Sequence, residues 1–291
     1  MAGKLFCQLC PLTYQLSTWR MQGNRWLSDR TAALTGRLRL AGHRAEPLPV
    51  VVYAHRSLIL RTLGGADPVL QQHKKVNLTL SAPKVDGILI RPGETFSFWH
   101  LVGRCSARAG YQVGLVIRSG QPDRGVGGGM CQFTNLIHWM ALHSPLTITE
   151  RHHHDGLDLF PDHNRQVPFG TGTSILWNYL DYRLTNNTGI TFQLCVRVAG
   201  DYLEGELRAS EPLPQSYHVF TEGEGFVRED GQVFRVGRVY RRTVDKRTGN
   251  TLSCDLIQQN HARVCYDPAF IAPERFLDGP AQKSSSGACH E

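Results

Sequence analysis

The sequence predicts an α+β protein: an N-terminal helical or mixed segment, followed by a central Gly-rich loop and a helix packed on a mainly antiparallel β-sheet. Two observations predict this class. Over 131–143 the apolar residues recur at intervals of three and four, which is the spacing of a helix with one buried face. After that helix, short segments rich in β-branched and aromatic residues are separated by turn residues, which is typical of antiparallel strands.

The elements before the Gly-rich loop follow from periodicity and turn residues. Leucines and alanines at broadly helical spacing among arginines predict a helix near 18–41. The following segments are expected to be a loop and short strand at 47–54, a helical turn at 58–63, a helical or extended segment at 72–80, and strand residues at 88–90 and 96–98 around a Pro-Gly turn.

The elements from residue 110 onward are expected to be mainly strands. They are a strand at 110–119 with a turn at 121–124, the helix at 131–143, strands at 146–150, 174–183, 191–198 and 202–209 with a hairpin-like turn at 186–189, and a terminal hairpin of 231–244 and 251–259. We divide the chain into an N-terminal segment (1–80), an α+β domain (81–275) and a flexible Ser-, Gly- and Gln-rich tail (276–291).

Composition excludes several classes of protein. The first thirty residues contain no apolar run of signal-peptide length, and no later run reaches the roughly 18 to 20 residues of a membrane span, so we expect a cytoplasmic protein. Eight cysteines in 291 residues are too dilute for a disulfide scaffold, and we expect free thiols. The net charge of +7 favours an anionic small-molecule or peptide ligand. Nucleic-acid binding is disfavoured, because the basic run 235–247 is more typical of the exposed face of a hairpin. The sequence predicts no cofactor. It leaves the oligomeric state open.

The segment before the central helix is the most informative part of the chain. Gly127, Gly128 and Gly129 are costly in backbone entropy, so such a run indicates positive φ angles or close approach by another backbone or a ligand. Cys131 then falls in the first turn of the helix, where unpaired N–H groups favour an anion, and we expect a lowered thiol pKa.

A proton partner for this thiol is expected downstream, in the segment Arg151–Asp155. If the strand extends to residue 154, His152 and His154 share one face, which could meet Cys131, and His153 takes the other. Asp155 or Asp162 could orient the imidazole, in a Cys-His-Asp arrangement whose layout loosely resembles that of transglutaminase-like thiol enzymes.

Other interpretations of these residues stay open. A buried Cys131 could be an ordinary core residue, and Cys131, His152, His154 and an aspartate could instead form a tetrahedral zinc site, although no recognised metal motif is present. Arg165, in a loop of polar residues, could pair with a carboxylate or phosphate, or could simply be solvated.

The motifs together resemble those of the VanW family, which is named from vancomycin-resistance gene clusters. The resemblance covers about Lys4 to Pro268 and is carried by the segments 92–98, 102–103, 110–111, 125–132, 150–152 and 186–188. It implies a link to the cell wall or to glycopeptide resistance, with peptidoglycan or a D-amino-acid peptide precursor as the substrate class.

Our leading hypothesis is a thiol-dependent hydrolase or acyltransferase. Cys131 would be the nucleophile, His152 or His154 the base, and Asp155 or Asp162 the orienting acid. The backbone of Gly127–Gly129 and the side chain of Gln132 would stabilise an oxyanion. The alternative is a non-catalytic module that binds a cell-wall peptide or anionic ligand through Arg151, Arg165 and the glycine loop.

Overall fold

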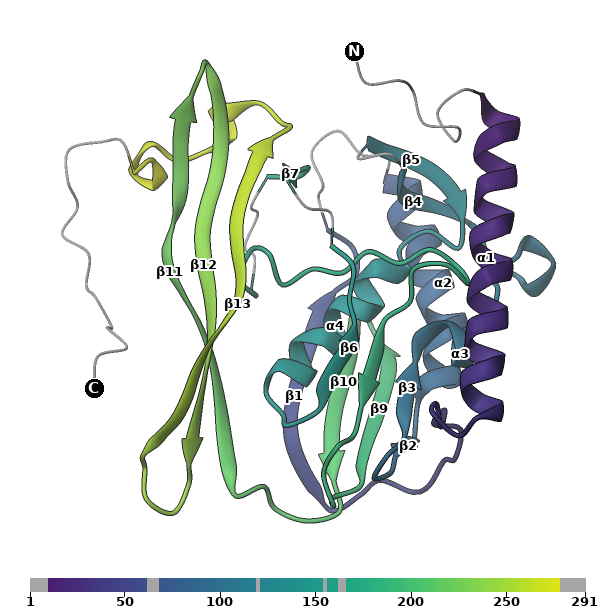
Figure 1. Ribbon diagram of the computed structural model, residues 1–291. Helices are drawn as coiled ribbons and strands as arrows, with labels where there is room; N and C mark the ends of the chain where they lie inside the picture. Colours follow the sequence, from purple (N-terminus) through teal and green to yellow (C-terminus); the bar gives the residue numbers. More distant parts are fainter. Residues whose placement is uncertain (1–9, 62–67, 119–120, 154–155, 162–165, 278–291) are drawn as a thin grey trace.

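The computed structural model describes residues 10–61, 68–118, 121–153, 156–161 and 166–277 (Figure 1). It confirms the α+β class: helices pack on a mainly antiparallel sheet, a long helix runs along one side of the molecule, and a separate sheet of long strands stands on the other side. Within these residues, no helix has the length and apolar character needed to cross a membrane.

The helices are α1 (Pro11–Leu34), α2 (Pro68–Val85), α3 (Phe98–Val102) and α4 (Met130–Leu142), with short 3-10 helices at Ala107–Ala109, Pro268–Phe270 and Pro273–Arg275. The strands are β1 (Val50–Leu58), β2 (Ile88–Ile90), β3 (Thr95–Ser97), β4 (Val113–Arg118), β5 (Gln121–Val126), β6 (Thr147–Glu150), β7 (Leu157–Asp158), β8 (Arg183–Thr185), β9 (Phe192–Ala199), β10 (Tyr202–Ala209), β11 (Gln215–Glu229), β12 (Gln232–Asp245) and β13 (Thr251–Val264).

The core lies between α4, α2 and an antiparallel sheet of order β1-β10-β9-β2. Phe133, Leu194 and Leu207 are fully buried there. Gly205 in β10 allows α4 to pack closely against the sheet, because a Cβ atom at this position would lie only 2.8 Å from Cε of Met140. Apolar burial on this scale is the main stabilising term of the fold, and it holds α4 against the sheet.

The remaining strands form smaller sheets around this core. Strands β3, β8 and β6 make one sheet, and β4 and β5 form a hairpin that leads into the Gly-rich loop. The terminal hairpin that the sequence predicts is confirmed as β12 and β13. It is joined by β11, which we did not predict, and by a short parallel pairing with β7.

A cluster of charged side chains holds α1 against the body of the protein. The Arg25 guanidinium pairs with Glu150 of β6, and Arg183 of β8 pairs with Asp29 and with Asp181. These side chains are largely buried, with exposed fractions between 4% and 26%, so each ion pair has lost most of its water and is strengthened by the lower local dielectric. The helix predicted near 18–41 corresponds to α1, which begins earlier, at Pro11, and ends at Leu34.

Several predicted elements are wrong. Segment 174–182 is not a strand, because Asn178 has a φ of 50° and the chain folds back through a bridge between Leu176 and Leu180. The turn at 186–189 joins strands of two different sheets rather than a hairpin. Residues 121–124 lie in strand β5 instead of a turn. Phe98 begins a helix, because the Ser97 hydroxyl accepts a hydrogen bond from the backbone of His100 as an N-cap.

Candidate functional site

The Gly-rich loop connects strand β5 to α4 and is held by hydrogen bonds from its backbone N–H groups. The N–H groups of Gly127 and Gly129 donate to the carbonyls of Gln112 (2.9 Å) and Leu115 (3.1 Å), and that of Gly128 donates to Gly125 at 3.2 Å. All three N–H groups are therefore already used within the protein. The glycine backbone that we expected to stabilise an oxyanion is not available for that role.

The glycines are required by close packing. Gly127 and Gly129 have φ angles of 78° and 100°, a region that residues with a side chain rarely adopt. A Cβ atom on Gly128 would lie 2.6 Å from the carbonyl oxygen of Gly114, and one on Gly129 would lie 2.9 Å from Cδ of Lys74. The close approach that the glycine run predicts is confirmed, and the atoms that approach belong to β4 and α2.

Cys131 lies in the first turn of α4, half-buried, as the sequence predicts. Burial raises the pKa of its thiol, although a hydrogen bond from the Ile175 backbone acts in the opposite direction. The expected lowering of the thiol pKa is therefore wrong. Loss of water around the sulfur outweighs the favourable field of the helix N-terminus.

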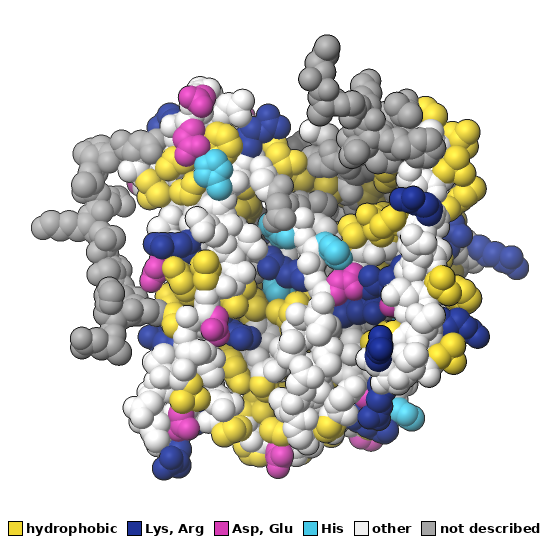
Figure 2. Space-filling model, viewed as in Figure 1, with side chains coloured by type: hydrophobic (Ala, Val, Ile, Leu, Met, Phe, Trp, Pro, Cys, Tyr) yellow, Lys and Arg dark blue, Asp and Glu magenta, His cyan; other side chains and the backbone are white. Residues whose placement is uncertain are grey.

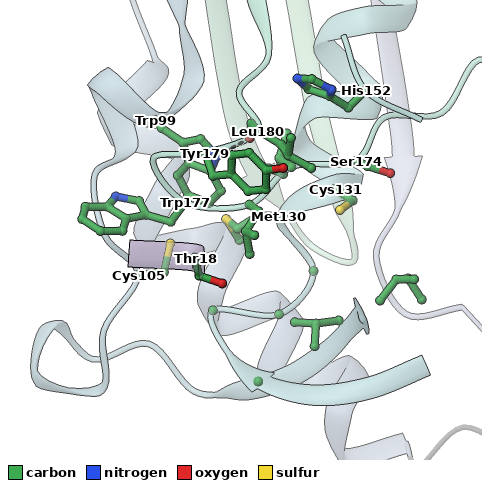
Figure 3. A pocket seen from close by; sticks show the side chains of 18 of the residues that line it. Thr18, Trp99, Cys105, Met130, Cys131, His152, Ser174, Trp177, Tyr179 and Leu180 are labelled. Carbon is green, nitrogen blue, oxygen red and sulfur yellow. Dashed lines mark hydrogen bonds between the residues drawn. The ribbon is translucent and has the colours of Figure 1, made fainter. Parts of the chain in front are cut away.

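His152 does not face the thiol. Its Nε2 atom lies 2.9 Å from Oε1 of Glu150, within the charged cluster that holds α1. Figure 3 shows the imidazole ring well separated from the Cys131 sulfur and directed away from it. Strand β6 ends at Glu150, so the alternation from which we chose His152 does not continue to this residue.

His153, which the sequence analysis placed on the opposite face, is the imidazole on the side of Cys131. It lines the same two cavities as the thiol. A Cβ atom on Gly172 would lie 3.4 Å from Nε2 of His153 and 3.9 Å from Oδ1 of Asn135, so both side chains lie beside Gly172. Asn135 is one helical turn beyond Cys131 on α4. The other predicted partners of the thiol, His154, Asp155 and Asp162, lie outside the described residues, as does Arg165.

Two predicted binding side chains have structural partners. The Gln132 amide nitrogen donates to Oγ of Ser57 and to the Leu58 carbonyl, both at 2.8 Å, so it ties α4 to β1 and is not free to stabilise an oxyanion. The Arg151 guanidinium donates to the carbonyls of Gly170 and Gly172, which fixes the loop beside His153.

A large cavity of about 1210 Å³ opens in front of Cys131. Histidine and charged side chains gather near the centre of this face, between α1 and the C-terminal sheet (Figure 2). Figure 3 shows Trp99, Trp177 and Tyr179 grouped to one side of Cys131. Helix α1 completes the wall with Tyr14 and Trp19. Aromatic walls with a few polar groups are typical of sites for organic ligands and peptides.

A second, smaller cavity of about 300 Å³ lies beside the first. The residues that line both cavities are Leu115, Val116, Ile117, Gly129, Cys131 and His153. Cys131 therefore stands at the boundary between them. The small cavity also contains Gln71 and Lys74 of α2, which are only 6% and 7% exposed. Neither residue was predicted from the sequence: Lys74 falls in segment 72–80, whose pattern fits a helix or a strand, and Gln71 immediately precedes this segment.

Metal binding gains no support from the described residues. No group of three or more His, Cys, Asp or Glu side chains in this part of the chain is arranged to hold a metal ion. His154 and Asp155, two of the ligands considered for zinc, lie outside it.

The fold and the site define a class: an α+β protein with a cysteine at the N-terminus of a buried helix, between a large aromatic cavity and a small polar one. The family model for VanW like protein matches residues 73–208. The Vancomycin B-type resistance protein VanW of Enterococcus faecalis is 33% identical over 221 residues, which cover 76% of this chain and 80% of that protein. The chain belongs to the VanW family.

A second relative matches a shorter part of the chain. The uncharacterized protein YoaR of Bacillus subtilis is 32% identical over 113 residues, which cover 38% of this chain and 34% of that protein. No solved structure matches significantly.

Proposed function

We propose that this protein is a thiol-dependent hydrolase or acyltransferase that acts on a peptide of the bacterial cell wall, with Cys131 as nucleophile. The observation that carries the proposal is the position of Cys131, which forms part of the wall of both cavities together with His153. A nucleophile and an imidazole on one ligand-sized cavity are the parts that acyl transfer through a cysteine requires.

His153 replaces His152 as the proposed base. His152 lines the large cavity but is paired with Glu150, whereas His153 lines both of the cavities that the thiol lines. Because burial raises the pKa of Cys131, the resting sulfur is a protonated thiol, and a base must take its proton as the reaction begins. His154, Asp155 and Asp162 remain candidates for orienting that base.

The reaction would proceed in two steps. The Cys131 sulfur attacks a peptide carbonyl carbon, and its proton passes to His153; the C–N bond then breaks, and the proton goes to the departing amine, which leaves a thioester. Water or a second amine then attacks the thioester and restores the thiol. The Gln132 N–H donates to the Gly129 carbonyl at 3.0 Å, so the N–H groups of Met130 and Cys131, at the start of α4, replace the glycine backbone as candidate donors to the oxyanion.

The cell-wall substrate class rests on the relative's name and on the cavity. The Enterococcus faecalis relative is a vancomycin resistance protein, and glycopeptide resistance concerns cell-wall peptides. The large cavity has the size and the aromatic walls that suit a peptide. The net charge of +7 favours a ligand that carries carboxylates.

A binding module without catalysis is the second candidate. The raised thiol pKa favours it, because an unreactive buried cysteine is an ordinary structural residue. In that case the aromatic cavity would hold the same peptides without cleaving them.

Trapping of the covalent intermediate separates the two candidates. The protein is incubated with a synthetic cell-wall stem peptide that contains D-amino acids, quenched in acid, and analysed by intact-mass and peptide mass spectrometry. We expect an acyl adduct on Cys131 and a processed peptide, both absent in Cys131→Ala. Cys195→Ala is the matched control, because Cys195 is also half-buried but lies on the central sheet, and it should keep both. Tight peptide binding with no adduct and no product would favour the binding module.

A further inference from the structure

We infer that the small cavity beside Cys131 is a subsite for the C-terminal residue of a peptide, in which Lys74 pairs with the free carboxylate and Gln71 accepts a hydrogen bond from the amide N–H of that residue. This inference names the substrate class of the function proposed above. As a statement about binding it does not require the thiol to react.

The first observation is a buried cation that lacks a counter-ion. Lys74 is 7% exposed and lines the small cavity, and among the described residues no carboxylate or hydrogen-bond acceptor pairs with its ammonium group. An isolated charge in a protein interior is costly, so a buried lysine is normally paired. Burial, together with the positive charge of Arg61, lowers the pKa of Lys74 to about 7. A bound anion would supply the charge that the site lacks.

The second observation is an unsatisfied acceptor one helical turn before the lysine. Gln71 is 6% exposed, lines the same cavity, and its Oε1 atom has no hydrogen-bond partner among the described residues. A buried acceptor without a partner costs about 1 to 3 kcal/mol, so the site also requires a donor. Gln71 and Lys74 are three positions apart on α2 and therefore share one helix face.

One ligand class offers both groups at a suitable spacing. The last residue of a peptide carries a carboxylate and, one carbon away, its own amide N–H. An inorganic phosphate offers the charge but no amide. The cavity of about 300 Å³ is at the lower end of the range for small-molecule sites, which suits a terminal fragment rather than a whole peptide.

The charges of the other groups around the small cavity are compatible with a bound anion. Arg61 adds positive charge, and burial lowers the pKa of His55 so that its ring is neutral at pH 7. Asp158 is the acidic residue of the described wall, and it already lies 3.5 Å from Arg235 and accepts a hydrogen bond from the Tyr266 hydroxyl. His153 stands between this cavity and the larger one.

In this binding mode Cys131 would lie next to the terminal peptide bond. With the carboxylate at Lys74, the preceding carbonyl would lie toward the wall that carries the thiol, and the rest of the peptide would extend into the aromatic cavity. The departing group in the proposed reaction is then the C-terminal residue, released as a free amino acid.

The test is calorimetric titration with N-acetyl-Ala-Ala, as the L,L and the D,D peptide, in the Cys131→Ala background so that no turnover occurs. We expect at least one of the two peptides to bind, and the same peptide with a C-terminal carboxamide to bind at least tenfold more weakly. Lys74→Met should weaken binding of the acid by a similar factor and abolish the preference for acid over amide. Inorganic phosphate should compete weakly or not at all.

Matched controls lie next to each residue on α2. Lys75→Met removes a lysine that pairs with Asp201 at 2.9 Å, and Gln72→Leu removes an exposed amide; both should leave the affinity unchanged, whereas Gln71→Leu should lower it several-fold. Equal affinity for acid and amide in the Cys131→Ala protein, or no binding of either peptide, would overturn the subsite without reference to any variant. Binding of phosphate in place of the peptide would also overturn it. Acid-selective binding with no acyl adduct on Cys131 would keep the subsite and reject the proposed chemistry.

Discussion

Gly129 and Lys74 are in direct contact: a Cβ atom on Gly129 would overlap Cγ of Lys74 and lie 2.9 Å from its Cδ. The glycine run and the buried lysine are therefore parts of one arrangement. The loop that delivers Cys131 to the start of α4 also covers the stem of the lysine, which contributes to the burial of its ammonium group.

This contact makes Gly129 sensitive to substitution. Gly129→Ala should reduce the free energy of unfolding by roughly 2 to 4 kcal/mol, because it combines a φ of 100° with overlap against Lys74. Gly189→Ala is the control, since its Cβ atom would meet open space and its φ is not positive. Urea denaturation measures both. Equal stability of the two variants would show that α2 and α4 can move apart at no cost.

Lys74 should make the stability depend on pH. Its pKa is about 7 in the folded protein and near 10.5 when unfolded, so the unfolded chain holds the proton more tightly. The destabilisation is fully present below pH 7 and fades as the pH rises toward 10.5. We therefore expect Lys74→Met to be more stable than the wild type by about 3 to 5 kcal/mol at pH 6, with the difference shrinking by pH 10. Denaturant melts of both proteins across this range test the sign, and a difference that does not change with pH would contradict it.

The cysteines should react in an order set by their surroundings. Burial raises the pKa of Cys131, whereas hydrogen bonds with Thr13 lower that of the exposed Cys10. At pH 7 we expect iodoacetamide to modify Cys10 well before Cys131, and the rate at Cys131 to keep rising above pH 9. Tandem mass spectrometry that localises each adduct to one cysteine follows both rates. Faster labelling of Cys131 than of Cys10 at pH 7 would mean that its thiol is activated at rest.

The docking of α1 should be sensitive to acid. Glu150 is partly desolvated, which alone would raise its pKa, but hydrogen bonds from Arg25, the Asp181 backbone and His152 outweigh this and lower it. The pKa of Glu150 in the folded protein lies below its unfolded value of about 4.5. The stability that the ionised Glu150 contributes is therefore present above pH 4.5 and is lost as the pH falls through the folded pKa.

Removal of the Glu150 charge tests this docking. Glu150→Gln should lower the free energy of unfolding by about 2 kcal/mol near pH 7, because it removes one of the carboxylates that the partly buried Arg25 and Arg183 pair with. The variant should also lose less stability than the wild type on acidification. Glu211→Gln, at an exposed position, is the control. Limited proteolysis of α1, followed at pH 7 and pH 4, provides the measurement. The prediction is contradicted if both variants release α1 at the same rate.

The sequence is most informative where a segment has one strong local signal. Helix α4 follows from the spacing of Phe133, Leu136, Ile137 and Met140, all of which are buried, and strand pair β12 and β13 follows from its turn residues. Segment 174–182 has the apolar and aromatic residues of a strand, but its conformation is decided by distant groups: Gln22 of α1 bonds to the Trp177 carbonyl and accepts from Asn178. Contacts of this kind leave no periodicity in the sequence.

Some residues of the candidate site can likewise be predicted from the sequence, and others cannot. Cys131 and the glycine run stand out because consecutive glycines before a helix require a packing reason. Lys74 does not stand out, because it is next to Lys75 in a segment whose apolar residues show no clear helical spacing. Only the packing of α2 against the loop distinguishes the buried Lys74 from the more exposed Lys75. The choice among the three adjacent histidines depended on where β6 ends, which is set by its pairing with β8.

If Cys131 reacts as proposed, the unequal volumes of the two cavities would make the protein treat the two ends of a linear peptide differently. The cavity at Lys74, with about 300 Å³, would limit the size of the fragment that enters it, whereas the aromatic cavity, with about 1210 Å³, would accept larger and more varied substituents. Specificity would then depend mainly on one end of the substrate.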